Sequence, residues 1–281
     1  SVGAPWFNLV FTPFMVALAV ILPVAAALPW KRGRIMKVMR WMWPAAALAF
    51  AVGALIWAMQ TGRSALAPVG IALAVWLVAG PLLELAERAK VGRVPSEEWR
   101  RRLANLPRAD WGKATAHAGL GLTFFGIAAI TAWETETVAA VKPGDVIESG
   151  GYEFRFEGVE SRRGPNYTYD RGTFVAMKDG REVAVLYPEK RFYPVQRMPT
   201  TEAAIDSGLA RDLYIALGDR QADPSEWAAR VYVKPFANWI WIGALVMSLG
   251  AVLSLTDRRY RVGAAAKRRA VGPAPDAVPA E

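Results

Sequence analysis

The stretch KATAHAGLGLTFFGIAAIT, at residues 113–131, is apolar enough to cross a membrane as a helix, yet it contains His117, the single histidine of the chain. A transmembrane helix needs about 20 predominantly apolar residues. An ionisable side chain within such a helix is energetically costly and usually faces the interior of the helix bundle. The stretch therefore predicts both a membrane protein and a candidate functional residue.

Apolar blocks of similar length occur elsewhere in the chain, and together with the opening stretch they predict five transmembrane helices. At 1.5 Å per helical residue each block reaches roughly 27–33 Å, about the thickness of a hydrocarbon core. The second block contains Pro44 and Gly53, which membrane helices tolerate, and the third ends with the acid Glu84. The blocks are residues 7–28, 41–59, 65–85, 114–132 and 238–255.

The net charge of +9 would suit a nucleic-acid-binding protein, but the placement of the charges favours a different interpretation. Residues 31–40 carry five Lys or Arg, residues 86–113 carry eight, and the tail after residue 255 carries six, whereas the 60–64 turn carries only Arg63. With five spans in alternation, the three basic segments fall on one side. The positive-inside rule makes that side cytoplasmic, so we expect a lipid bilayer and no nucleic acid as partner.

These patterns predict an α-helical polytopic membrane protein with five spans and a small periplasmic antiparallel β domain between the fourth and fifth spans. Residues 1–133 would hold four spans and the cytoplasmic loops 29–40 and 86–113. Residues 134–237 would form the β domain, 238–256 the last span and 257–281 a disordered cytoplasmic tail. In a Gram-negative cell the chain would lie in the bacterial inner (plasma) membrane, with the soluble domain in the periplasm and the carboxy terminus in the cytoplasm. The chain has no cysteine, so no disulfide can stabilise that domain.

Short alternating runs of apolar and polar residues predict the β structure. Residues 151–158 place Tyr152, Phe154 and Phe156 on one face of a strand. Residues 172–187 read as a hairpin that turns at Asp179-Gly180. The run DLYIALGD favours another strand, and RFYP favours an edge strand ended by proline. A small barrel or a sandwich would satisfy these patterns.

The segment YPEKRFYP, at residues 187–194, sets Glu189, Lys190 and Arg191 between aromatic residues. One interpretation is a charged hairpin edge that prevents strand-to-strand aggregation. The other is a docking surface for an acidic partner or for one that carries haem propionates. The residues alone leave both interpretations open.

Three roles compete for His117: a hydrogen bond between helices, proton relay, and ligation of a metal or haem. Gly121 lies one turn away on the same face, and Phe124 and Phe125 follow two turns on. A bare helix face under aromatic rings suits a planar ligand. A relay would require acids in this span, which has none. A second axial ligand is not evident, although Met15, Met59 and Met247 exist.

Other chemistries have little sequence support. The chain contains no HExxH, no P-loop and no GxGxxG in a βαβ setting, and a single histidine far from the β domain excludes a Ser/His/Asp set there. A transporter is disfavoured because we expect no paired charges inside the spans and see no inverted repeat.

Several stretches together resemble the carboxy-terminal part of CcmF, the large membrane subunit of the bacterial cytochrome c haem lyase. They cover residues 1–261 in the order found in the family. The stretches are SVGAPWFN, AHAGLGL, YPEKRFYPVQRMPTTEAAI, DLYIALGD and YVKPFANWIWIGALVMSLGAVLSLTDRRYR.

This resemblance implies that His117, in its AHxG context, is one of two membrane histidines that hold a b-type haem. The family's haem lyase attaches haem to the CxxCH motif of apocytochrome c. The haem arrives on the chaperone CcmE, and CcmH and CcmI deliver the apoprotein. Docking of such partners would fall to the outer domain.

The tryptophan-rich haem-handling segment of the family, its other membrane histidine and its two outer-side histidines are absent from this sequence. We therefore expect a fragment or one piece of a split protein, whose partner is the amino-terminal half. The alternative is a non-enzymatic scaffold in which the outer domain recruits partners and His117 only packs.

Overall fold

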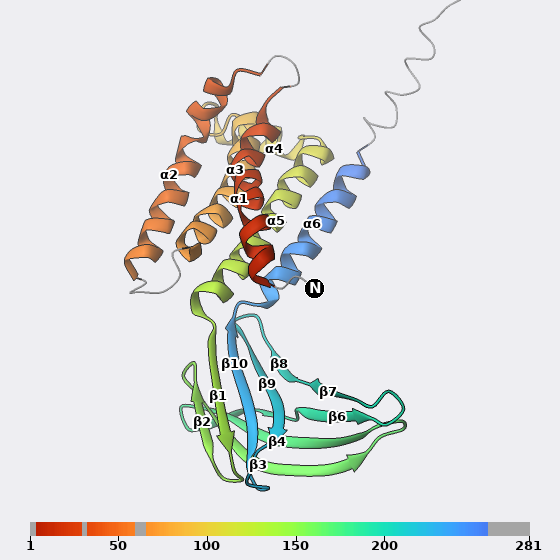
Figure 1. Ribbon diagram of the computed structural model, residues 1–281. Helices are drawn as coiled ribbons and strands as arrows, with labels where there is room; N and C mark the ends of the chain where they lie inside the picture. The colour runs from red at the N-terminus through yellow and green to blue at the C-terminus, as the bar shows by residue number, and fades with distance from the viewer. Residues whose placement is uncertain (1–3, 30–32, 60–65, 258–281) are drawn as a thin grey trace, which may run out of the picture. The chain divides into compact units, whose positions relative to one another are not determined.

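The computed structural model describes residues 4–29, 33–59 and 66–257. Its described part contains six helices and ten strands and divides into two compact units (Figure 1). One unit comprises the residues up to 51, residues 73–121 and those from 243 onward, and the other comprises residues 52–72 and 122–242. The predicted tail, 257–281, lies outside the described residues apart from Asp257.

Five helices in the described part are long and apolar enough to cross a membrane, as predicted. The carbonyl of Pro107 accepts the first backbone hydrogen bonds of the fourth long helix, which begins at Arg108. The helix therefore begins six residues before the predicted span, which started at residue 114. A short helix, α4 (Ser96–Ala104), lies in the loop before it. The long helices are α1 (Ala4–Ala27), α2 (Ile35–Met59), α3 (Leu66–Ala89), α5 (Arg108–Trp133) and α6 (Asn238–Leu255).

Helices α1, α2 and α3 pack together in the first unit around a small apolar cluster. Val38 and Met42 of α2 are buried against Trp76 of α3. The Trp76 indole donates a hydrogen bond of 3.1 Å to the carbonyl of Val20 in α1. The side chain of one helix thereby stabilises the backbone of another.

The β domain consists of two antiparallel sheets, which confirms the predicted antiparallel fold. One sheet has the order β1-β10-β9-β8, and the other has the order β2-β3-β4-β6-β7 with β5 also paired to β4. The strands are β1 (Thr135–Val141), β2 (Val146–Ser149), β3 (Tyr152–Arg163), β4 (Thr168–Lys178), β5 (Arg181–Leu186), β6 (Glu189–Tyr193), β7 (Met198–Glu202), β8 (Ala204–Ser207), β9 (Arg211–Arg220) and β10 (Trp227–Pro235).

Alternate residues of both sheets form one apolar core. Phe156 of β3 stacks on Phe174 of β4 with ring centroids 4.8 Å apart, and Leu213 and Ile215 of β9 are fully buried in the same cluster. The period-two pattern predicted this inward face in β3. It also predicted β9 at the run DLYIALGD.

The hairpin between β4 and β5 turns at Asp179-Gly180, as predicted. Lys178 pairs with Arg181, so Asp179 and Gly180 form the whole loop. Both adopt positive φ values, 51° and 71°. A two-residue turn with both φ values positive matches the right-handed twist of the flanking strands.

Strand β6 is not the edge strand that RFYP predicted. It lies between β4 and β7 and pairs with both. Pro194 follows the last residue of β6, so the proline ends the strand without interrupting a hydrogen-bond ladder. The interpretation of YPEKRFYP as a protected sheet edge is therefore wrong.

Replacing Phe174 with Ala should destabilise the β domain by about 3–5 kcal/mol, because the cavity left in a packed core is not filled. Phe192→Ala is the matched control, since the Phe192 side chain is 45% exposed, and it should cost less than about 1 kcal/mol. Chemical denaturation of the purified chain in detergent measures both values. Equal losses would contradict the assigned core.

Candidate functional site

His117 lies in the first unit, in the middle of α5, and its side chain is half-buried. The ring atom Nδ1 is buried and makes no hydrogen bond with any part of the chain that the structure describes. A buried polar atom without a partner costs about 1–3 kcal/mol. A purely structural role would use a hydrogen bond at Nδ1, and the described contacts do not include one. An imidazole with an uncommitted nitrogen fits the requirement for an axial ligand of haem iron.

The glycines near His117 are packed against other helices. A Cβ on Gly119 would lie 2.5 Å from the backbone nitrogen of Met247 in α6, and one on Gly121 would lie 2.7 Å from Cγ2 of Val78 in α3. Gly112 is equally close to the backbone of Ser254. The face predicted to be bare is therefore filled by α3 and α6. Small residues allow this close approach of helices in a membrane, and the role of Gly121 in packing a planar ligand stays a prediction.

The two phenylalanines that follow belong to the second unit. Both are half-buried. The ring of Phe125 packs against Phe236 and Trp239, with centroids 5.3 and 5.7 Å apart. These contacts fix the ring of Phe125 at the start of α6. A part for Phe124 or Phe125 in packing haem stays a prediction.

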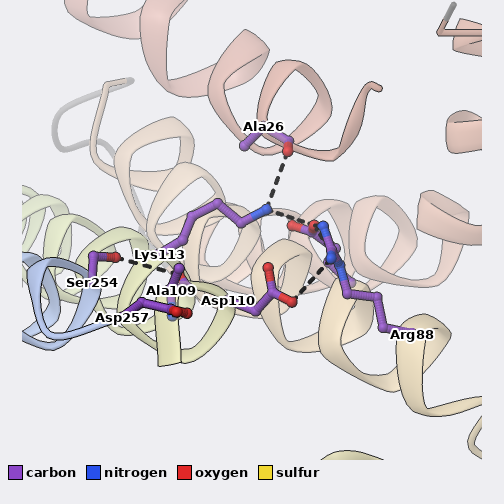
Figure 2. A network of polar contacts seen from close by, with 8 residues as sticks. Ala26, Arg88, Ala109, Asp110, Lys113, Ser254 and Asp257 are labelled. Carbon is purple, nitrogen blue, oxygen red and sulfur yellow. Dashed lines mark hydrogen bonds and ion pairs between the residues drawn. The ribbon is translucent and has the colours of Figure 1, made fainter. Parts of the chain in front are cut away.

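A network of charged side chains lies one turn from His117 in the first unit (Figure 2). Lys113 Nζ lies 2.6 Å from Oε1 of Glu84 in α3 and donates to the carbonyl of Ala26 in α1, at 3.2 Å. Arg88 bridges Glu84 and Asp110, at 2.8 and 3.0 Å. Glu84 is only 6% exposed. The two acids and two bases neutralise each other.

A second set of contacts joins α6 to the start of α5. Asp257 Oδ2 accepts a hydrogen bond of 3.0 Å from the backbone N–H of Ala109, at the positive end of the α5 dipole. The hydroxyl of Ser254 donates to the Ala109 carbonyl at 3.3 Å. The polar contacts therefore tie α5 to α1, α3 and α6.

The expectation that the spans contain no paired charges is wrong, because Glu84 and Lys113 form an ion pair between α3 and α5. The sequence does contain a signal for such a pair. Glu84 is the single acid of an apolar block, and an acid at such a position needs a partner. The sequence does not say which of the many nearby cations that partner is.

Replacing Glu84 with Gln should destabilise the helical unit by about 2 kcal/mol, because Lys113 would keep its charge without its carboxylate partner. The full cost of breaking a buried pair is reduced here by the 26% exposure of the Lys113 side chain. The thermal unfolding of the purified chain in detergent measures the effect. Glu98→Gln, which removes a surface pair with Arg102, is the control and should change little. Equal effects of the two substitutions would contradict the role of the network.

The three residues predicted for partner docking do not form one surface. Glu189 is buried and accepts from Arg171 and Arg191, at 2.7 and 2.8 Å. Lys190 instead pairs with Asp219 of β9, at 2.7 Å. Successive strand residues point to opposite faces, so Lys190 lies on the face toward β9 and its two neighbours lie on the other. A docking role for these three residues stays a prediction.

The two arginines control the ionisation of Glu189. Burial alone would raise its pKa, but the hydrogen bonds from Arg171 and Arg191 outweigh burial and hold the pKa below its usual value of 4.5. A lowered folded-state pKa means that the stabilisation is present above the unfolded-state pKa and is lost as the pH falls through the folded-state value.

Glu189→Gln should therefore lower the free energy of unfolding by about 2 kcal/mol at neutral pH, because the charged hydrogen bonds to both arginines weaken. The difference from the parent chain should shrink as the pH falls below the unfolded-state pKa of a glutamate, about 4.3, toward the lowered folded-state pKa of Glu189. Chemical denaturation at several pH values measures it. Glu202→Gln, at a more exposed carboxylate, should give a smaller effect, and a pH-independent difference would contradict this explanation.

Fold and site together define a polytopic helical membrane protein with a β sandwich before its last span and a histidine inside another span. A family model described as the CcmF C-terminal beta-sandwich matches residues 132–235. The whole chain is 50% identical to 41% of the cytochrome c-type biogenesis protein ccl1 of Rhodobacter capsulatus. The chain is also 36% identical to the CcmF protein of Escherichia coli, in an alignment that covers 93% of this chain and 39% of that protein.

A solved structure titled cytochrome c heme lyase CcmF matches 90% of this chain and 41% of its own chain, with a TM-score of 0.69 and 22% identity, and so supports the fold. The chain belongs to the CcmF family and corresponds to the carboxy-terminal portion of its members. It spans 39 to 41% of the length of the curated relatives reported above. Those relatives are cytochrome c-type biogenesis proteins.

Proposed function

We propose that this chain forms part of a cytochrome c haem lyase and that His117 is an axial ligand of haem b in the membrane. The observation that carries the proposal is the uncommitted Nδ1 atom of His117 inside an apolar helix. The biogenesis names of the relatives support the biological setting. Bound haem would supply one-electron chemistry at this position.

The chain's own residues would hold and orient the imidazole. Close packing through Gly119 and Gly121 fixes α5 against α6 and α3 within about one turn of the histidine. The Lys113–Glu84 pair limits sliding of α5 along α3 one turn away. A rigid helix positions a ligand more accurately than a loop does. His117 is therefore a good axial ligand by position, independently of which group completes the iron coordination.

The second axial ligand is proposed to come from the amino-terminal half of the protein. The chain has no other histidine. The proposed route passes haem from CcmE to the CxxCH motif of apocytochrome c, which CcmH and CcmI present. The basic segments between the helices support an orientation with the β domain in the periplasm and the carboxy terminus in the cytoplasm.

The direct test is His117→Ala in the chain co-expressed with the remainder of the protein. We expect the low-spin b-type absorbance to disappear while the protein accumulates normally, because the iron loses one axial ligand. Added imidazole should restore part of the signal. Ser248→Ala, an exposed substitution in α6, is the control and should leave the spectrum unchanged.

An unchanged spectrum in the His117 variant would overturn the proposal. In that case the alternative of a non-enzymatic scaffold would stand, with the β domain recruiting partners. A scaffold also predicts that haem content is normal and that partner capture is lost when Arg191 and Lys190 are neutralised. The two functions therefore predict different haem contents for the same preparation of the His117 variant.

A further inference from the structure

A cavity of about 480 Å³ lies in the helical unit, where α1 ends and α2 begins. The cavity is lined by Arg34, which directly precedes α2, and by Lys37 and Trp41 of α2. Glu84, Glu87 and Arg88 line it from α3. All of these residues belong to the same compact unit. The cavity plays no part in the proposed ligation of haem by His117.

The acids that line the cavity are already paired. Glu84 is bound by Lys113 and Arg88, at 2.6 and 2.8 Å. Glu87 is bound by Arg93, at 2.7 Å. Neither carboxylate therefore offers an uncompensated negative charge to the cavity.

The two cations at the start of α2 are not compensated by ion pairs in this way. Arg34 and Lys37 are exposed and form no ion pair with a residue described by the structure. The first turn of α2 contains no acid. Cations at the start of a helix also meet the positive end of its dipole, which is unfavourable unless an anion is near. The cavity thus combines space for a ligand with an excess of positive charge.

The position of the cavity suggests the source of the anion. Because α1 and α2 are both long and apolar enough to cross a membrane, the end of α1 and the start of α2 fall at the membrane–water interface. Trp41 lines the cavity two turns after Arg34, and tryptophan favours that depth. Farther along the two helices, away from the cavity, apolar side chains such as Ile21 of α1 and Trp43 of α2 are exposed. Phospholipid headgroups occupy the same level, with their acyl chains along such surfaces.

We propose that this cavity binds the phosphate headgroup of an anionic phospholipid, with Arg34 and Lys37 as its ligands. Basic pockets between transmembrane helices are suited to such headgroups. Arg34 can donate two parallel hydrogen bonds to phosphate oxygens, and Lys37 provides a compact charge one turn along the helix. The bound lipid would also hold the α1–α2 junction together.

The test titrates the purified chain in detergent with phosphatidylglycerol and follows the bound lipid by native mass spectrometry. Each cation near a lipid phosphate contributes about a fivefold gain in affinity. The double variant R34Q/K37Q should therefore bind phosphatidylglycerol at least about tenfold more weakly. The matched control R101Q/R108Q removes two exposed arginines outside the cavity and should bind as the parent does.

A second variant tests the same electrostatics in the opposite direction. Glu87→Gln removes a lining acid and frees Arg93, so it should tighten binding by about fivefold. Phosphatidylcholine should bind weakly and without sensitivity to these substitutions, and millimolar inorganic phosphate should not displace phosphatidylglycerol. Equal binding by all variants would overturn the proposal. Displacement by inorganic phosphate would assign the cavity to a soluble anion and overturn the lipid assignment.

Discussion

The ion pair between Lys113 and Glu84 is the constraint on which the helical unit depends. Each residue lies in a helix long and apolar enough to cross a membrane, and neither charge can be left alone there without a large desolvation cost. Pairing requires α5 to meet α3 at one register along the helix axis. The carbonyl of Ala26 adds the end of α1 to the same point. A single electrostatic requirement thereby aligns three helices.

The alignment leaves little freedom to the part of α5 that carries His117. Gly119 and Gly121 bring the helix close to α6 and α3, so the surfaces beside the histidine are occupied by protein. The Nδ1 atom of His117 is buried in the same part of α5 and has no hydrogen-bond partner among the described residues. The ion pair and the glycines position the imidazole, and neither supplies it with a hydrogen bond in the described structure.

Patterns local in sequence predicted most of the fold. Block length predicted the five spans, period-two alternation predicted the inward face of β3, and Asp179-Gly180 predicted a hairpin. The errors concern partners that are distant in sequence. The placement of β6 beside β7 and the burial of Glu189 by Arg171 depend on which strands pair, and no local pattern encodes that choice.

The candidate site divides in the same way. His117 became a candidate from the sequence because one imidazole in an apolar span is conspicuous by itself. Its surroundings were not found, because a glycine next to a histidine looks the same in sequence whether a ligand or another helix covers it. The structure places α3 and α6 there. The pairing of Glu84 with Lys113 was missed for a similar reason, since their helices are separated by a loop and a short helix.

Direct detection of a bond between His117 and haem iron tests the central claim most sharply. Because the chain has one histidine, labelling it with ¹⁵N-histidine marks a single imidazole. The labelled chain would be reconstituted with the unlabelled remainder of the protein and haem, and electron–nuclear double resonance would be recorded on the low-spin ferric state. The account predicts a ¹⁵N hyperfine coupling of the size of a directly bound nitrogen. A spectrum with only ¹⁴N couplings would contradict it.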